Sequence, residues 1–196
     1  MERPPRVIST VRFTLRIWDE RDGDAHYAAS CDNREHLRQW EGWAQAEPSL
    51  STSQQWVEWC GHLYAMGRGF VYGMFDPDAR AVLGSAGLHP VAGRPDWSVG
   101  YWTDARHLRR GYATDAAAIL TSTAFELGAT AEAEIHCNEA NTASAAIPRR
   151  LGYELTDITD APAQAPLQVD RWMRWTLTRP AFEASEARGR ALSLLV

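Results

Sequence analysis

The pattern of hydrophobic and polar residues predicts one strand and two helices in the first third of the chain. Residues 10–18 alternate between apolar and polar side chains and contain β-branched residues, as in a half-buried strand. Apolar residues then recur with helical spacing within 19–43. A second helix is expected to end near Met66, with Ser51 or Ser53 as its N-terminal cap.

Three short apolar segments follow, separated by turn residues such as proline, glycine and aspartate. This spacing is typical of an antiparallel meander, whose strands we expect at 69–75, 81–89 and 97–103. An apolar stripe then predicts a long helix over 111–127, which Gly128 ends.

The last third of the chain alternates between strands and helices. We expect strands at 131–137, 153–158 and 167–177. A helix is expected between the first two of these strands, at 142–151. This order of elements predicts an α/β domain with a mixed sheet. We assign residues 1–178 to the domain and 179–196 to a C-terminal tail, expected as a short helix or a frayed segment.

Composition restricts the class of protein. A chain of 196 residues with 45% hydrophobic and 23% charged residues suits one soluble domain and excludes wholesale disorder. No apolar run reaches the roughly 20 residues of a membrane span, and the first residues lack the apolar stretch of a signal peptide. A net charge of -5 argues against general nucleic-acid binding.

Cysteine and histidine usage adds two expectations. The three cysteines have unrelated spacings, which predicts reduced thiols in the cytoplasm and not a disulfide framework. No pair of histidines or cysteines has metal-ligand spacing, so we expect no metal. We therefore expect a cytoplasmic protein with neither a membrane nor a nucleic-acid partner.

The segment 99–114 carries the first chemical signal. A strand leads through Arg106 into a loop that holds Gly111, where the long helix starts. Unpaired N–H groups at a helix start lie at the positive end of the helix dipole and suit an anion. Arg109 and Arg110 add positive charge beside them. On these residues alone, a plain turn with a solvated face is the alternative interpretation.

Three motifs in order extend this signal: Leu15-Arg16-Ile17 with Asp24-Ala25; Gly100-Tyr101-Trp102 before Arg110-Gly111-Tyr112-Ala113-Thr114-Asp115-Ala116; and Asn141-x-x-Ser144 before Arg150-Leu151-Gly152-Tyr153. With them, the sequence resembles the GNAT superfamily of acyl-CoA N-acyltransferases. Within the superfamily it is most similar to the Rim branch, which contains ribosomal-protein N-terminal acetyltransferases and small-amine relatives. The resemblance covers about residues 10–178. It implies the GNAT fold, an α/β fold with a mixed, mostly antiparallel sheet flanked by helices.

The resemblance implies acetyl-CoA as the co-substrate. The pantetheine arm would lie along the strand edge at Tyr101, Trp102 and Thr103, and Asn141 would hold it. Arg150 would reach a phosphate. The pyrophosphate would sit on the backbone amides of Leu108, Arg109, Arg110, Gly111, Tyr112, Ala113 and Thr114.

Four residues depart from the family's pattern. Leu108 stands where the family has glutamine or arginine, and Arg109 stands where a glycine is common. Pro148 occupies the position of a tyrosine acid in many relatives, which makes Ser144 the candidate acid. A helix-capping or CoA-binding serine is the alternative role for Ser144. Ser98 replaces a glutamate that is frequent in Rim relatives, so the position of the base is open.

Two further residues are candidates near the expected cleft. His89 ends a strand there, and a neutral imidazole is a suitable base near pH 7. A structural histidine is the alternative. Cys137 is expected near the thiol of CoA, as a small buried residue and not as a nucleophile.

The acceptor site is expected between the two early helices and the loop before the last strand. An aromatic wall with an acidic rim suits a cationic amine, whereas core packing is the alternative role for the tryptophans. The residues of this region are Trp40, Trp43, Trp56, Trp59, Glu41, Glu47 and Glu58.

The sequence therefore predicts an acetyl-CoA-dependent N-acetyltransferase, active as a monomer or homodimer. Its acceptor would be the primary amine of a small molecule or of a peptide N terminus, which attacks the thioester directly. Two alternatives remain open. One is transfer of another acyl group such as succinyl, received by Arg94 or Arg109, and the other is a non-catalytic acyl-CoA-binding module.

Overall fold

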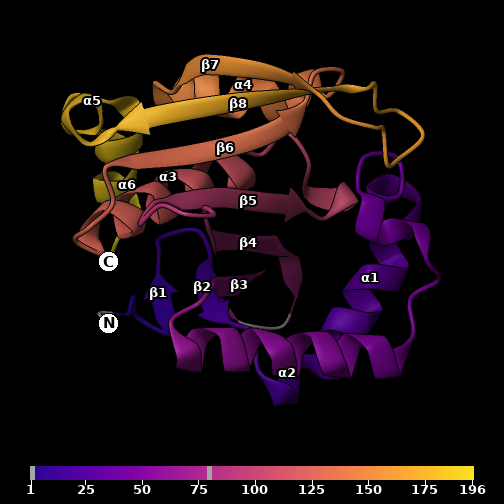
Figure 1. Cartoon of the computed structure of the whole chain (residues 1–196). Coiled ribbons are helices and arrows are strands. Elements are labelled where there is room, and N and C mark those ends of the chain that lie inside the picture. The colour runs from indigo at the N-terminus through magenta and orange to yellow at the C-terminus, as the bar shows by residue number, and fades with distance from the viewer. Residues whose placement is uncertain (1–2, 79–80) are drawn as a thin grey trace.

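The computed structural model describes residues 3–78 and 81–196. In this part of the chain the strands form one eight-stranded sheet with the order β1-β2-β3-β4-β5-β6-β8-β7 (Figure 1). Neighbouring strands are antiparallel except β5 and β6, which are parallel. The strands are β1 (Val7–Ser9), β2 (Thr14–Ile17), β3 (Phe70–Phe75), β4 (Val82–Pro90), β5 (Trp97–Thr103), β6 (Glu132–Asn138), β7 (Glu154–Asp160) and β8 (Arg171–Thr178).

Helices cover the sheet in two groups. The buried face of α3 is rich in alanine. These small side chains let the helix lie close against β4 and β5. The α6 helix packs on α3, while α1 and α2 pack on each other beside the other part of the sheet (Figure 1). The helices are α1 (Gly23–Leu37), α2 (Leu50–Met66), α3 (Tyr112–Glu126), α4 (Thr142–Leu151), α5 (Arg179–Glu183) and α6 (Glu186–Leu194).

The expected first strand over 10–18 is wrong in its bounds. A turn at Thr10 divides this region into the β1–β2 hairpin, because the Thr10 hydroxyl accepts a 2.9 Å hydrogen bond from the backbone N–H of Phe13. Phe13 is fully buried, whereas Val11 is exposed at the turn. The cap of α2 also differs: it is Ser49, which accepts from the Thr52 N–H, and neither Ser51 nor Ser53.

The last strand starts at Arg171, four residues later than the expected 167–177. The residues before this strand form a loop, which hydrogen bonds from two side chains hold in place. The Asn138 side chain donates to the Val169 carbonyl at 2.7 Å and accepts from its N–H, and the Gln168 amide donates to the Trp40 carbonyl at 2.5 Å. These bonds attach the loop to β6 and to the end of α1 (Figure 1).

The segment 179–196 forms two helices that join the core. Phe182, Ala187 and Ala191 are buried in the same hydrophobic cluster as α3. An isolated antiparallel bridge also pairs Thr10 with Leu195, so the first hairpin and the last helix lie side by side (Figure 1). In the described residues, no helix is long and apolar enough to cross a membrane.

Candidate active site

The parallel strands β5 and β6 separate soon after they meet. Their pairing is confined to Trp97 with Ala133 and Ser98 with Glu134, although β5 continues to pair with β4 as far as Thr103. Beyond Ser98, the edge of β5 that faces β6 therefore lacks a strand partner. Such an edge presents backbone N–H and C=O groups that can bind an amide-containing chain.

A groove of about 150 Å³ lies at this separation. Residues of β5 form one wall, and Cys137, Asn141 and Ser144 belong to the opposite wall. Asn141 caps α4, because its side-chain oxygen accepts a 3.0 Å hydrogen bond from the Ser144 N–H. The residues predicted to hold pantetheine and to act as acid are thus brought together with Tyr101.

Tyr101, Cys137 and Ser144 line the same groove. The Tyr101 hydroxyl oxygen lies 3.4 Å from Ser144 Oγ and 3.3 Å from the Ser144 carbonyl oxygen. Burial raises the pKa of Tyr101. Burial also raises the pKa of the Cys137 thiol. Both groups therefore stay protonated at neutral pH, and Cys137 lacks the thiolate character of a nucleophile.

The expected phosphate loop lies before α3. Gly111 is the N-cap of α3 with φ +84°, so the helix starts without a side-chain cap over its N–H groups. Arg109 also adopts a left-handed conformation, with φ +58°. Leu108, Arg109 and Arg110 are exposed, and Ala113 is half-buried in the first helical turn. The loop is exposed and the helix start has no side-chain cap, so the anion site at this loop stays a prediction.

Two arginines that the sequence analysis missed lie beside Gly111. A Cβ on Gly111 would be 3.5 Å from Nη1 of Arg12 and 3.5 Å from Nη2 of Arg190. Both guanidinium groups bind the carboxylate of Asp115, which is fully buried. Arg12 also donates to the Arg110 carbonyl at 2.7 Å. One buried carboxylate thus fixes two cations at the start of α3.

The remaining predicted binding residues are placed differently. Trp102 lines the larger cavity described next and is not among the residues that line the groove. Thr103 and Thr114 are buried, and the ring of Tyr112 supports the Arg12 guanidinium, 4.8 Å from the ring centre. Arg150 is exposed on α4 and is not among the residues that line either cavity.

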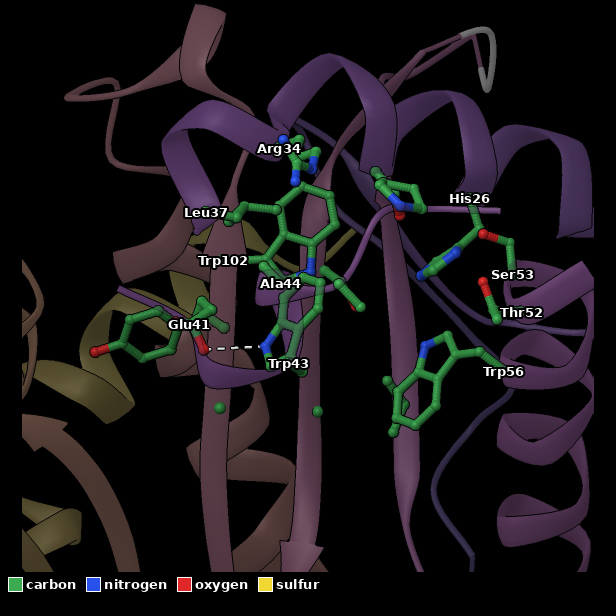
Figure 2. A pocket seen from close by; sticks show the side chains of 18 of the residues that line it. His26, Arg34, Leu37, Glu41, Trp43, Ala44, Thr52, Ser53, Trp56 and Trp102 are labelled. Carbon is green, nitrogen blue, oxygen red and sulfur yellow. Dashed lines mark hydrogen bonds between the residues drawn. The ribbon is translucent and has the colours of Figure 1, made fainter. Parts of the chain in front are cut away.

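A larger cavity of about 600 Å³ opens between α1, α2 and the sheet. Figure 2 shows Trp43, Trp56 and Trp102 around it, with Glu41 hydrogen-bonded to Trp43. Trp43 and Trp56 therefore lie where the sequence analysis expects an acceptor. Of the other residues expected there, Glu47 lines this cavity and Trp40 lines the groove. Trp59 and Glu58 are exposed on α2 and are not among the lining residues of either cavity.

His89 belongs to the wall of the larger cavity. It lies opposite Ser98 in the β4–β5 pair, the position where a glutamate was expected from the resemblance. Its Nε2 would be 3.3 Å from a Cβ on Gly100, so the ring lies over Gly100. His89 as a whole is exposed at the end of β4, but its ring is partly desolvated against the sheet, which lowers its pKa, so the imidazole is neutral near pH 7.

The groove and the cavity have three lining residues in common: Glu41, Gly100 and Tyr101. The two spaces therefore meet at the middle of β5. Among the described residues, no group of three or more histidine, cysteine, aspartate or glutamate side chains is arranged to hold a metal ion.

Comparison with known proteins gives a family match and structural neighbours. A family model described as acetyltransferase (GNAT) domain matches residues 12–154. A search of curated proteins finds no match. One similar solved structure is RimL, a ribosomal L7/L12 alpha-N-protein acetyltransferase with coenzyme A joined to one of its cysteines by a disulfide. It has 20% identity and a TM-score of 0.80, over 89% of this chain and 99% of that one.

Two further neighbours have the same fold. The microcin C7 self-immunity acetyltransferase MccE, in complex with acetyl-CoA and AMP, has 15% identity, a TM-score of 0.77 and coverage of 86% and 93%. A ribosomal-protein-S5-alanine acetyltransferase from Vibrio fischeri has 15% identity, a TM-score of 0.75 and coverage of 87% and 94%. These neighbours agree with the resemblance to the Rim branch and confirm the expected fold. With the family model matching most of its length, the chain belongs to the GNAT acetyltransferase family.

Proposed function

We propose that this protein is an acetyl-CoA-dependent N-acetyltransferase that acetylates a primary amine, on a small molecule or a peptide N terminus. The observation that carries the proposal is the meeting of the groove and the larger cavity at Gly100 and Tyr101. An acyl donor in the groove would present its thioester at this junction. An amine in the cavity would reach the same point, which is the geometry that direct transfer requires.

The residues present fit coenzyme A at three places. The unpaired edge of β5 suits the amide groups of pantetheine, and Asn141 lines the same groove. The uncapped start of α3, with Arg12 and Arg190 beside it, suits the phosphates. RimL and MccE are each described in complex with coenzyme A or acetyl-CoA, which supports a coenzyme A thioester as the co-substrate.

Acetyl-CoA supplies an activated thioester, so the protein has to position an amine and move protons. His89 would take the proton from the amine, because its imidazole is neutral and faces the cavity. The freed lone pair of the amine nitrogen then forms the C–N bond as the C–S bond breaks, and the second proton of the nitrogen replaces the one that Ser144 gives to the sulfur. The Ser144 hydroxyl would donate a proton to the departing thiolate from the groove side.

Transfer of a succinyl group gains no support from Arg94. Its guanidinium is bound by Glu134 and lies within 4 Å of carboxylate oxygens of Asp96 and Glu132. The charge of Arg94 is therefore already balanced by these neighbouring carboxylates. To bind the carboxylate of a succinyl group, the protein would need a cation without such partners. We expect the acetyltransferase to act in the cytoplasm, as a monomer or homodimer.

Calorimetric titration with acetyl-CoA, succinyl-CoA and CoA tests the proposal, followed by assay of thiol release on a panel of primary amines. We expect micromolar binding with a preference for acetyl-CoA, and amine-dependent thiol release. Binding without turnover on any amine would assign the chain to the non-catalytic acyl-CoA-binding alternative. No binding to any of the three would overturn the placement of the cofactor.

A further inference from the structure

The larger cavity combines a mostly apolar wall with one partly buried carboxylate that has no ion-pair partner among the described residues. Tryptophans, leucine, valine and alanine form much of its wall, and its volume of about 600 Å³ lies within the roughly 300–1,000 Å³ of small-molecule sites. The aromatic contribution comes from three elements: Trp43 in the short 3-10 helix Gly42–Gln45 after α1, Trp56 on α2 and Trp102 on β5 (Figure 2). A flat apolar group would contact more than one indole ring here.

Glu41 is the carboxylate at the junction of this cavity with the groove. It follows α1 and lines both spaces, together with Gly100 and Tyr101. Burial raises the pKa of Glu41, and a 3.0 Å hydrogen bond from Nε1 of Trp43 opposes this effect by stabilising the carboxylate. In the described part of the chain, no cationic side chain lies within ion-pair distance of Glu41. A partly buried carboxylate without a cation gains most from a ligand that brings one.

The other charged groups of the cavity are already neutralised. Glu47 is 2.7 Å from the Arg34 guanidinium, which also lies 3.3 Å from Glu35. Burial lowers the pKa of His26 to about 4 and also lowers that of His89, so both rings are neutral near pH 7. One carboxylate therefore remains to receive one cation, at the place where the amine has to meet the thioester.

We propose that the acceptor is a monoamine with an aromatic or similarly flat apolar body, whose ammonium group binds Glu41 while its body lies among Trp43, Trp56 and Trp102. This inference rests on the proposed acetyltransferase function and narrows its acceptor. A polyamine would place a second ammonium group against apolar wall without a partner. A peptide N terminus would bring backbone amides that each need a hydrogen-bond partner, against a wall whose surface is mostly apolar.

Binding of 2-phenylethylamine, compared with its uncharged analogue 2-phenylethanol, tests the role of Glu41 without turnover. We expect Glu41→Gln to weaken binding of the amine by about tenfold to a hundredfold, the effect of losing a charge-assisted hydrogen bond. Binding of the alcohol should change less than about threefold. Glu154→Gln, on the exposed strand β7, is the matched control and should leave both affinities unchanged.

Trp56→Ala tests the body of the ligand, because it removes an indole ring and keeps the carboxylate. This variant should weaken the amine and the alcohol by a similar factor. Equal losses of amine and alcohol binding in Glu41→Gln would overturn the proposal, since Glu41 would then act only through the shape of the cavity. Tighter binding of spermidine or of an alanine-starting tripeptide than of 2-phenylethylamine would also overturn it.

The same titrations separate the two proposals. Charge-dependent binding of 2-phenylethylamine without consumption of acetyl-CoA would support this acceptor site and reject the transferase function. Thiol release with a peptide or polyamine, but not with 2-phenylethylamine, would support the transferase function and reject the monoamine acceptor.

Discussion

Nε of Arg190 in α6 donates a 2.5 Å hydrogen bond to Oδ1 of Asp115 at the start of α3. Arg12, from the β1–β2 turn, binds the other carboxylate oxygen. The carboxylate is fully buried, whereas both guanidinium groups are partly exposed. Asp115 thus links the first hairpin and the last helix at the loop expected to bind phosphate.

Asp115→Ala should lower the free energy of unfolding by about 3 kcal/mol, because two neighbouring guanidinium groups would lose their shared counter-charge. Urea denaturation of wild type and variant measures this loss. The control is Arg188→Ala on the same helix, which removes a surface pair with Glu183 and should cost less than about 1 kcal/mol. Equal losses in both variants would show that the Asp115 cluster has no special role in stability.

Gly111→Glu should abolish binding of acetyl-CoA, because a carboxylate would meet the pyrophosphate at close range. The matched variant is Gly111→Ala, which imposes the same backbone strain at φ +84° without the charge. We expect the alanine variant to keep measurable affinity by calorimetry. If both variants lose binding equally, strain explains the loss; if neither does, the phosphates bind elsewhere.

His89→Gln should lower kcat and remove the acidic limb from the pH profile of kcat/KM. A base works in its neutral form, so activity falls as pH drops through its pKa. Since burial lowers the pKa of His89, this fall should lie below the ordinary imidazole value of about 6.5. A pH profile recorded on both proteins checks the sign. An unchanged limb in His89→Gln would assign the proton transfer to another group.

Ser144→Ala should lower kcat by about a hundredfold with little change in the Kd of acetyl-CoA, if its hydroxyl protonates the departing thiolate. Thiol release and calorimetry give the two quantities separately. Thr142→Ala, exposed two residues earlier in α4, is the control for helix stability. A parallel fall in kcat and affinity would make Ser144 a binding residue.

Elements with strong local patterns could be predicted from the sequence. The α3 helix and the meander of β3, β4 and β5 appear where apolar periodicity and turn residues place them, because both signals act over a few residues. The division of 10–18 into two strands depends instead on the Thr10 turn and on burial of Phe13. Alternation alone does not reveal such a turn.

The site was predictable only as far as its residues are close in sequence. Asn141 and Ser144 lie one helical turn apart, and the loop before α3 is continuous. Arg12 is 103 residues from Asp115, and no periodicity connects them. Tyr101 and Trp102 are both expected at the strand edge that pairs with pantetheine, but successive side chains of a strand point to opposite faces, so their side chains face different spaces. The Tyr101 side chain therefore reaches Ser144, whereas the Trp102 side chain lines the larger cavity.

The Arg190–Asp115 bond also sets an order of events during synthesis. A chain leaving the ribosome exposes Asp115 75 residues before Arg190. Until then, α6 cannot pack on α3, and the buried carboxylate lacks one of its two cations. The loop expected to hold phosphate therefore acquires its second arginine only after residue 190 has emerged, so a chain that ends before this residue would have the sheet without Arg190 beside the loop.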